Sequence, residues 1–176
     1  MNAMDSQSTQ INMEYQFTSD RNGITDKQRK DVSAILDVSA RFKIFINDDL
    51  YFDQAEFPIL EFYTYLYNWK KAIDQSKRAQ EFHYYTLEFD EYEDGAILSI
   101  IPFGDSARLK SIWAEQELYH VFDLDYLIRA FLTLEKDLKR DIEAYFPIKL
   151  DKFIKHIPAV VFDWNRINRL FLSIVR

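Results

Sequence analysis

The chain has 176 residues, of which 48% are apolar and 16% aromatic, which is ample for one domain with a core of its own. It contains no cysteine, which excludes disulfide bonds, thiolate nucleophiles and cysteine-based zinc sites. The net charge of -7 at pH 7 disfavours nucleic acid as a partner.

The acidic charge is concentrated in the middle of the chain. Residues 1–84 carry 10 basic and 13 acidic side chains, residues 85–125 carry 2 and 10, and residues 126–176 carry 10 and 6. An acidic field of this kind repels phosphates and attracts a basic partner, with an association rate that salt lowers. The alternative is that these carboxylates only solvate a sheet face and its turns.

The first residues lack a basic region followed by an apolar run, and no window reaches the length of a membrane-spanning helix. We therefore expect a soluble cytoplasmic protein that does not associate with membranes. Residues 1–12 are expected to be a disordered segment. The alternation in residues 13–18 then predicts a short first strand.

Thr25 and Gln28 fit a capping box at the start of a helix. An apolar stripe of Val32, Ile35 and Leu36 extends that expected helix to about Ser39.

Residues 41–48 predict a second strand with Phe42, Ile44 and Ile46 on one face. The pair Asp48 and Asp49 predicts a turn into a short partner strand at residues 50–53.

Pro58 suits the first turn of a helix, where its missing amide costs nothing. Apolar residues then recur at spacings of three and four, which predicts a well-buried helix over residues 59–73. They are Ile59, Phe62, Leu66, Trp69 and Ile73, with a second row of Leu60, Tyr63 and Tyr67.

Residues 82–89, 96–103 and 108–113 predict a meander of three strands. An acidic turn ending at Asp94 and Gly95 joins the first two, and Gly104 with Asp105 joins the next two. Asp123 can then cap a long helix that Pro147 stops. One face of this helix is lined by Leu124, Leu127, Ile128, Phe131, Leu134, Leu138, Ile142 and Tyr145.

Together these elements predict an α+β fold, with one domain over residues 13–146 and an antiparallel sheet of about four to six strands. The helices are expected mainly on one face of that sheet. Residues 147–176 predict a C-terminal helical extension packed on the same domain. Strands and helices do not alternate strictly, which argues against a parallel doubly wound sheet.

The motifs of common enzyme classes are missing from the sequence. Three glycines cannot form the phosphate-binding loops of Walker or Rossmann type, and there is no G-x-S-x-G elbow. His83, His120 and His156 form no metal-binding pair on one helix, so no metal is expected unless folding brings two of them together with carboxylates. No cofactor or catalytic residue is expected either. An enzyme of unfamiliar type would need a pocket that holds His83 or His120 beside carboxylates.

The acidic stretch LEFDEYEDG, residues 87–95, superficially resembles a calcium loop. Counted from Asp90, it places Gly95 at the sixth position of an EF-hand. However, Tyr92 and Ile101 occupy positions that need oxygen ligands, so we interpret the stretch as a hairpin turn.

Two blocks of sequence carry a family resemblance. Residues 42–69, FKIFINDDLYFDQAEFPILEFYTYLYNW, combine a strand, an acidic turn, a short strand and a helix ending in Trp69. Residues 82–100, FHYYTLEFDEYEDGAILSI, and residues 109–117, LKSIWAEQE, add an aromatic strand, an acidic turn, an apolar strand and a strand with S-x-W. This arrangement resembles small acidic immunity proteins of bacterial polymorphic-toxin systems, which bind a toxin domain, often a nuclease.

The resemblance implies a cytoplasmic protein that neutralises a cognate toxin by occlusion. A nuclease must hold phosphates, so its active face tends to be basic and would complement acidic turns. The candidate partner-binding residues are Asp48, Asp49, Asp90, Glu91, Tyr92, Glu93 and Asp94, with Tyr92 as an aromatic anchor. The free protein is expected to be a monomer or a weak homodimer. The alternative is a non-enzymatic adaptor or regulatory domain that could form a homodimer through the helix at residues 59–73 or through the tail.

Overall fold

The computed structural model of the chain describes residues 8–86 and 95–155. Its first sheet has three antiparallel strands in the order β1-β2-β3, with β1 at Ile11–Phe17, β2 at Ala40–Ile46 and β3 at Asp49–Phe57. The predicted inward face of β2 is confirmed, because Phe42, Ile44 and Ile46 are all buried. β1 begins two residues before the expected start, inside the segment expected to be disordered.

The turn between β2 and β3 lies one residue earlier than predicted. Ile46 pairs with Asp49, so the two turn residues are Asn47 and Asp48, with φ angles of 49° and 70°. Positive φ at both positions is typical of a type I′ hairpin turn, which Asn and Asp tolerate better than other side chains. Asp49 is therefore the first residue of β3, and that strand extends to Phe57, beyond the expected residues 50–53.

The helix predicted between Thr25 and Ser39 is wrong, since this connection forms two 3-10 turns at Asp26–Gln28 and Val32–Ile35. The backbone amide of Thr25 does donate to Gln28 Oε1 at 2.8 Å, as in a capping box. Asp31, however, adopts extended backbone angles and its Oδ1 accepts from the Ser33 amide at 3.0 Å, which starts a second turn and breaks the first.

Both long helices are confirmed. α1 spans Ile59–Ser76 directly after Pro58, and most of its predicted seam is buried in the core. α2 spans Leu124–Tyr145 and ends just before Pro147. Asp123 caps it as expected, because its Oδ1 accepts from the Tyr126 amide at 2.8 Å. Among the described helices, none combines the length and the apolar content needed to cross a membrane.

The second sheet is the predicted meander with one added strand. Its order is β4-β5-β6-β7, with β4 at Phe82–Tyr84, β5 at Leu98–Phe103, β6 at Ser106–Lys110 and β7 at Phe122–Asp123. Gly104 and Asp105 form the predicted turn between β5 and β6, with Gly104 at a φ of 60°. The acidic turn at residues 87–94 lies outside the described residues.

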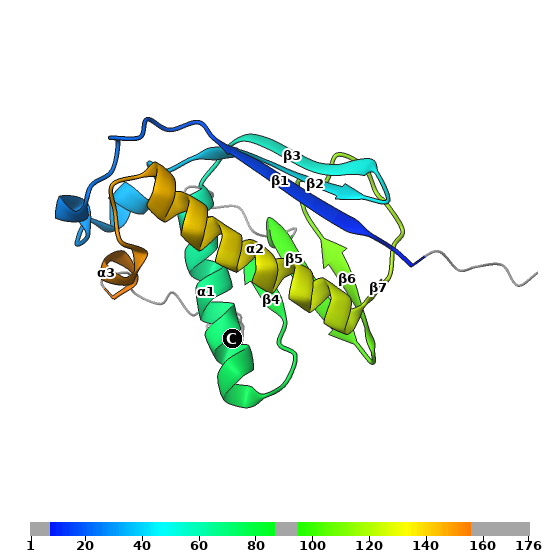
Figure 1. The fold of residues 1–176 in the computed structure, drawn as a ribbon. Coiled ribbons are helices and arrows are strands. Elements are labelled where there is room, and N and C mark those ends of the chain that lie inside the picture. The colour runs from blue at the N-terminus through cyan, green and yellow to red at the C-terminus, as the bar shows by residue number, and fades with distance from the viewer. Residues whose placement is uncertain (1–7, 87–94, 156–176) are drawn as a thin grey trace, which may run out of the picture.

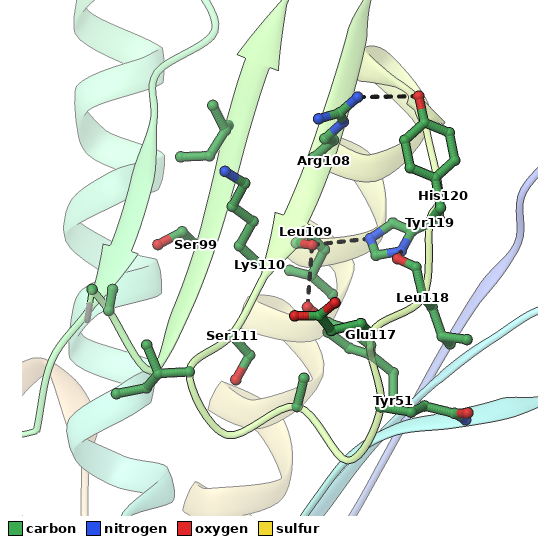
Figure 2. Close-up of a pocket in the computed structure, with 16 residues that line it drawn as sticks. Tyr51, Ser99, Arg108, Leu109, Lys110, Ser111, Glu117, Leu118, Tyr119 and His120 are labelled. Carbon is green, nitrogen blue, oxygen red and sulfur yellow. Dashed lines mark hydrogen bonds between the residues drawn. The ribbon is translucent and has the colours of Figure 1, made fainter.

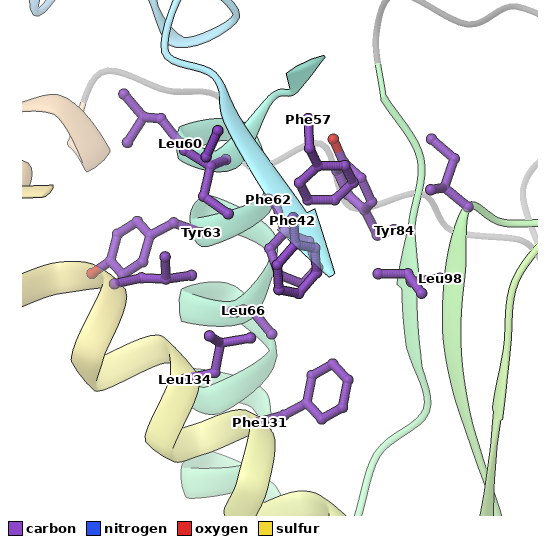
Figure 3. Packing of buried hydrophobic residues seen from close by; sticks show 14 of the residues in the cluster. Phe42, Phe57, Leu60, Phe62, Tyr63, Leu66, Tyr84, Leu98, Phe131 and Leu134 are labelled. Carbon is purple, nitrogen blue, oxygen red and sulfur yellow. The ribbon is translucent and has the colours of Figure 1, made fainter. Parts of the chain in front are cut away.

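The α+β class is confirmed, but the strands form two sheets instead of one. β3 and β4 are separated by α1 in the sequence, and their buried rings Phe57 and Tyr84 meet edge to face at 5.4 Å. Both sheets pack their inner faces against α1 and α2 (Figure 1). Figure 3 shows Phe42, Phe57, Phe62 and Tyr84 gathered where α1 meets these strands.

The predicted C-terminal extension is described up to residue 155. It contains one short helix, α3 at Leu150–Ile154, and Phe153 of this helix is fully buried in the same core. The Leu150 amide donates to Glu143 Oε1 of α2 at 2.9 Å.

Candidate functional site

Several connecting segments meet at one end of the molecule, on the right in Figure 1. The segment 111–121, between β6 and β7, is fastened to β3 because the Glu115 amide donates to the Tyr51 carbonyl at 2.8 Å. Gln116 Nε2 also donates to the Leu50 carbonyl at 2.9 Å. The start of α2 joins the same end, since the Ile11 amide donates to the Tyr126 hydroxyl at 3.0 Å.

These contacts bring the exposed carboxylates of the β2–β3 turn to the same end as those of residues 105–125. We call this surface the acidic end, and it consists of Asp48, Asp49, Asp105, Glu115, Glu117, Asp123 and Asp125. None of the seven forms an ion pair with a residue that the structure describes. Their charge is therefore left to attract cations from outside the molecule.

An arginine contacts two exposed aromatic rings beside the acidic end. Phe103 is 44% exposed and Tyr119 is 87% exposed, and they are the exposed large apolar side chains in the described part of the chain. The guanidinium carbon of Arg108 lies 5.4 Å from the centroid of the Phe103 ring and 5.2 Å from that of Tyr119. Arg108 Nη2 also donates to the Tyr119 hydroxyl at 3.2 Å. We call these three residues the Arg108 stack.

Arg108 and Tyr119 of this stack line an open cavity of about 630 Å³ on the outer face of the second sheet (Figure 2). The floor of the cavity carries Ser99 and Ile101 of β5 and Arg108 and Lys110 of β6, which point away from the helices. The segment 111–121 forms the opposite wall, with Glu117 among the lining residues. This cavity can accept a side chain of a ligand or partner.

His120 forms part of the cavity wall and is 8% exposed. Its Nδ1 lies 2.7 Å from the Leu118 carbonyl oxygen and its Nε2 lies 3.0 Å from that of Leu109. The Tyr51 hydroxyl also donates to the Leu109 carbonyl at 3.2 Å, and burial raises the pKa of Tyr51 to about 12. A neutral imidazole donates from one nitrogen, and when this is Nε2, its hydrogen bond to the Leu109 carbonyl joins the segment 111–121 to β6.

Burial lowers the pKa of His120, and the two carbonyl contacts offset this only in part. The folded state therefore binds this proton more weakly than the unfolded chain does, and stability falls as the pH drops below the ordinary histidine value of about 6.5. We expect the stability advantage of the wild type over His120→Gln to shrink between pH 7 and pH 5. Urea unfolding at both pH values measures it, and an equal difference at the two would contradict this assignment.

His83 contacts two groups that suggest catalysis. Its Nε2 lies 2.9 Å from Glu81 Oε2 and its Nδ1 lies 2.9 Å from Ser99 Oγ. A carboxylate, an imidazole and a hydroxyl in this order can activate a serine nucleophile. Ser99, however, is only 6% exposed and is the direct cross-strand partner of His83, so we interpret the contacts as support for the sheet.

The structure also bears on two other kinds of site, a metal site and a catalytic pair of carboxylates. In the ranges that the structure describes, no three His, Asp or Glu side chains are grouped to hold a metal ion. The pair Asp48 and Asp49 belongs to a hairpin, and Asp123 caps α2, as the sequence indicated.

The structure places Asp48 and Asp49 together in the acidic end. Asp90, Glu91, Tyr92, Glu93 and Asp94 lie outside the described residues, so their predicted role stays a prediction. Sequence reasoning missed the Arg108 stack. One signal could have found part of it. Arg108 and Lys110 are the two cations of the acidic residues 85–125, and two residues apart on a strand they share a face.

Residues 13–144 match the family model described as Domain of unknown function (DUF7878), and the chain belongs to this family. No curated protein and no solved structure matches the chain. The acidic end, the Arg108 stack and the cavity are therefore the features that bear on the function of the protein.

Proposed function

We propose that this member of the DUF7878 family is an immunity protein that binds a cognate bacterial toxin domain in the cytoplasm and neutralises it by occlusion. The observation that carries the proposal is Tyr119, whose ring is 87% exposed and lies beside a surface of unpaired carboxylates. Tyrosine and arginine are the residue types most enriched at the energetic centres of protein interfaces. An exposed tyrosine held by an arginine is thus a suitable anchor for a partner.

The carboxylates of the acidic end support a basic partner. Complementary charge mainly raises the association rate and selects among partners, while buried aromatic anchors supply much of the affinity. A nuclease toxin needs cationic groups to hold phosphates, so its active face would match this end. The exposed Tyr119 ring beside these carboxylates adds an anchor to the attraction of their charge.

One of the two homodimer interfaces of the adaptor alternative, the helix α1, has little apolar surface to offer a second copy. The apolar seam of α1, including Phe62, Leu66 and Trp69, is buried within the fold of its own chain. The exposed residues of this helix are mainly polar or charged, among them Asn68, Lys71 and Asp74. A homodimer through α1 would therefore bury little apolar surface, which favours the acidic end as the interface.

Co-expression with the product of the neighbouring gene tests the proposal. We expect a stable complex and protection of the host cell from that product's toxicity, with a monomer in sedimentation when the protein is alone. The absence of both binding and protection would reject an immunity role. A stable homodimer whose acidic end stays free would instead favour the adaptor.

A further inference from the structure

Arg108 is a cation without an anion in the most acidic part of the described structure. Arg41 pairs with Asp53 at 2.6 Å and Arg140 with Asp141 at 2.7 Å, whereas the other described arginines form no ion pair with a described residue. Arg108 forms no ion pair with any described residue, although Glu117 lines the same cavity. Lys110, which points to the same side of β6, has none either.

The guanidinium of Arg108 is nevertheless held in place. The rings of Phe103 and Tyr119 contact it, and Nη2 donates to the Tyr119 hydroxyl. Its Nε is buried and has no hydrogen-bond partner in the described structure. A buried donor without an acceptor costs free energy, and an acceptor that reaches the guanidinium from outside would offset that cost.

We propose that the Arg108 stack binds a carboxylate of the protein partner, from an aspartate or glutamate side chain that enters the cavity. Arginine presents its N–H groups in a planar fork that matches a carboxylate in two parallel hydrogen bonds. Contacts with two rings and with the Tyr119 hydroxyl hold the guanidinium in advance, so less side-chain freedom is lost on binding. Lys110 supplies a second positive charge on the cavity floor.

The surrounding charge selects a carboxylate on a protein over a free phosphate or nucleic acid. The seven carboxylates of the acidic end repel an anion that brings only negative charge. An acidic side chain of the toxin that lies within a basic surface is surrounded by the toxin's own cations. These cations pair with the acidic end while the carboxylate binds Arg108. The inference thus rests on the proposed function and adds that the basic face of the toxin contains an acidic residue.

The test compares Arg108→Gln and Arg108→Lys with the wild type in calorimetric titration against the purified toxin. We expect each variant to bind at least tenfold more weakly, because glutamine lacks the charge and lysine lacks the planar fork. Arg129→Gln removes the same charge from an exposed position on α2, close to Asp125, and is expected to bind as tightly as the wild type or slightly more tightly. Thermal unfolding checks that each variant is folded.

The direction of the effect distinguishes the inference from general electrostatics. Removing a cation makes the protein more acidic, so if Arg108 were a bystander, Arg108→Gln would bind a basic toxin equally well or better. That result, with wild-type binding intact, would reject carboxylate binding by Arg108 and leave the immunity role in place. If the wild type itself does not bind the toxin, both the carboxylate site and the immunity role are rejected. In a double-mutant cycle, one acidic residue of the toxin should couple to Arg108, and additivity at every acidic residue contradicts the pairing.

Discussion

Replacing Phe62 with alanine is expected to lower the free energy of unfolding by about 3–5 kcal/mol. The Phe62 ring is fully buried on α1, at the junction of the two sheets. Its centroid lies 5.5 Å from Phe42 and 5.2 Å from Phe57 of the first sheet, and 5.1 Å from Tyr84 and 6.0 Å from Phe82 of the second. Because rings from both sheets fix this site, the cavity left by the deletion cannot collapse easily.

Phe103→Ala is the matched control, since it deletes the same ring from a position that is 44% exposed. We expect this variant to lose less than about 1 kcal/mol, because much of the ring already faces water and a surface change rarely costs more. Urea unfolding of both variants measures the two losses. Equal losses would show that the contacts of Phe62 do not form the core that joins the sheets.

The sequence predicted the long elements well because their signals are local. α1 and α2 each combine apolar spacings of three and four with a start signal, Pro58 for α1 and Asp123 for α2. In β2, strict alternation places every second side chain in the core. These patterns need no information from distant residues.

Two kinds of feature were harder to predict. In one, a side chain competes with the backbone for hydrogen bonds, and in the other, strands pair or pack with residues far away in the sequence. Between Thr25 and Ser39 the apolar spacing favoured a helix, but Asp31 offered its carboxylate to a nearby amide and stopped it. β7 has two residues, which is too short for any periodicity. The division into two sheets depends on how Phe57 and Tyr84 pack across α1, which no local pattern encodes.

The candidate site could be predicted only in part for the same reason. Asp48 and Asp49 were found because an acidic hairpin turn is a local signal. Tyr119 gave no such signal, since its exposure depends on the segment 111–121 being fastened to Leu50 and Tyr51, more than 60 residues earlier in the chain. Arg108 meets Tyr119 only through that tertiary arrangement.

Removing four charges from the acidic end is expected to slow association with a basic toxin on the order of 10- to 100-fold at low salt. The variant carries Asp48→Asn, Asp49→Asn, Glu115→Gln and Glu117→Gln, which keep the shape of each side chain. Asparagine also tolerates the positive φ of 70° at position 48, so the hairpin should form as before. Because none of the four pairs with a described cation, their loss should leave thermal unfolding unchanged.

A second variant with the same net charge separates local from global effects. It carries Glu14→Gln, Asp20→Asn, Asp37→Asn and Asp74→Asn, four exposed positions away from the segments that meet at the acidic end. Asp20 lies just after β1 and Asp37 just before β2, at the ends of these strands that are far from the acidic end. Salt screens the attraction between such distant charges and a partner bound at the acidic end. We expect this control to associate at close to the wild-type rate in stopped-flow mixing, and added salt to slow the wild type far more than the acidic-end variant. Equal slowing of the two variants would assign the effect to net charge and leave the acidic end as a solvated surface.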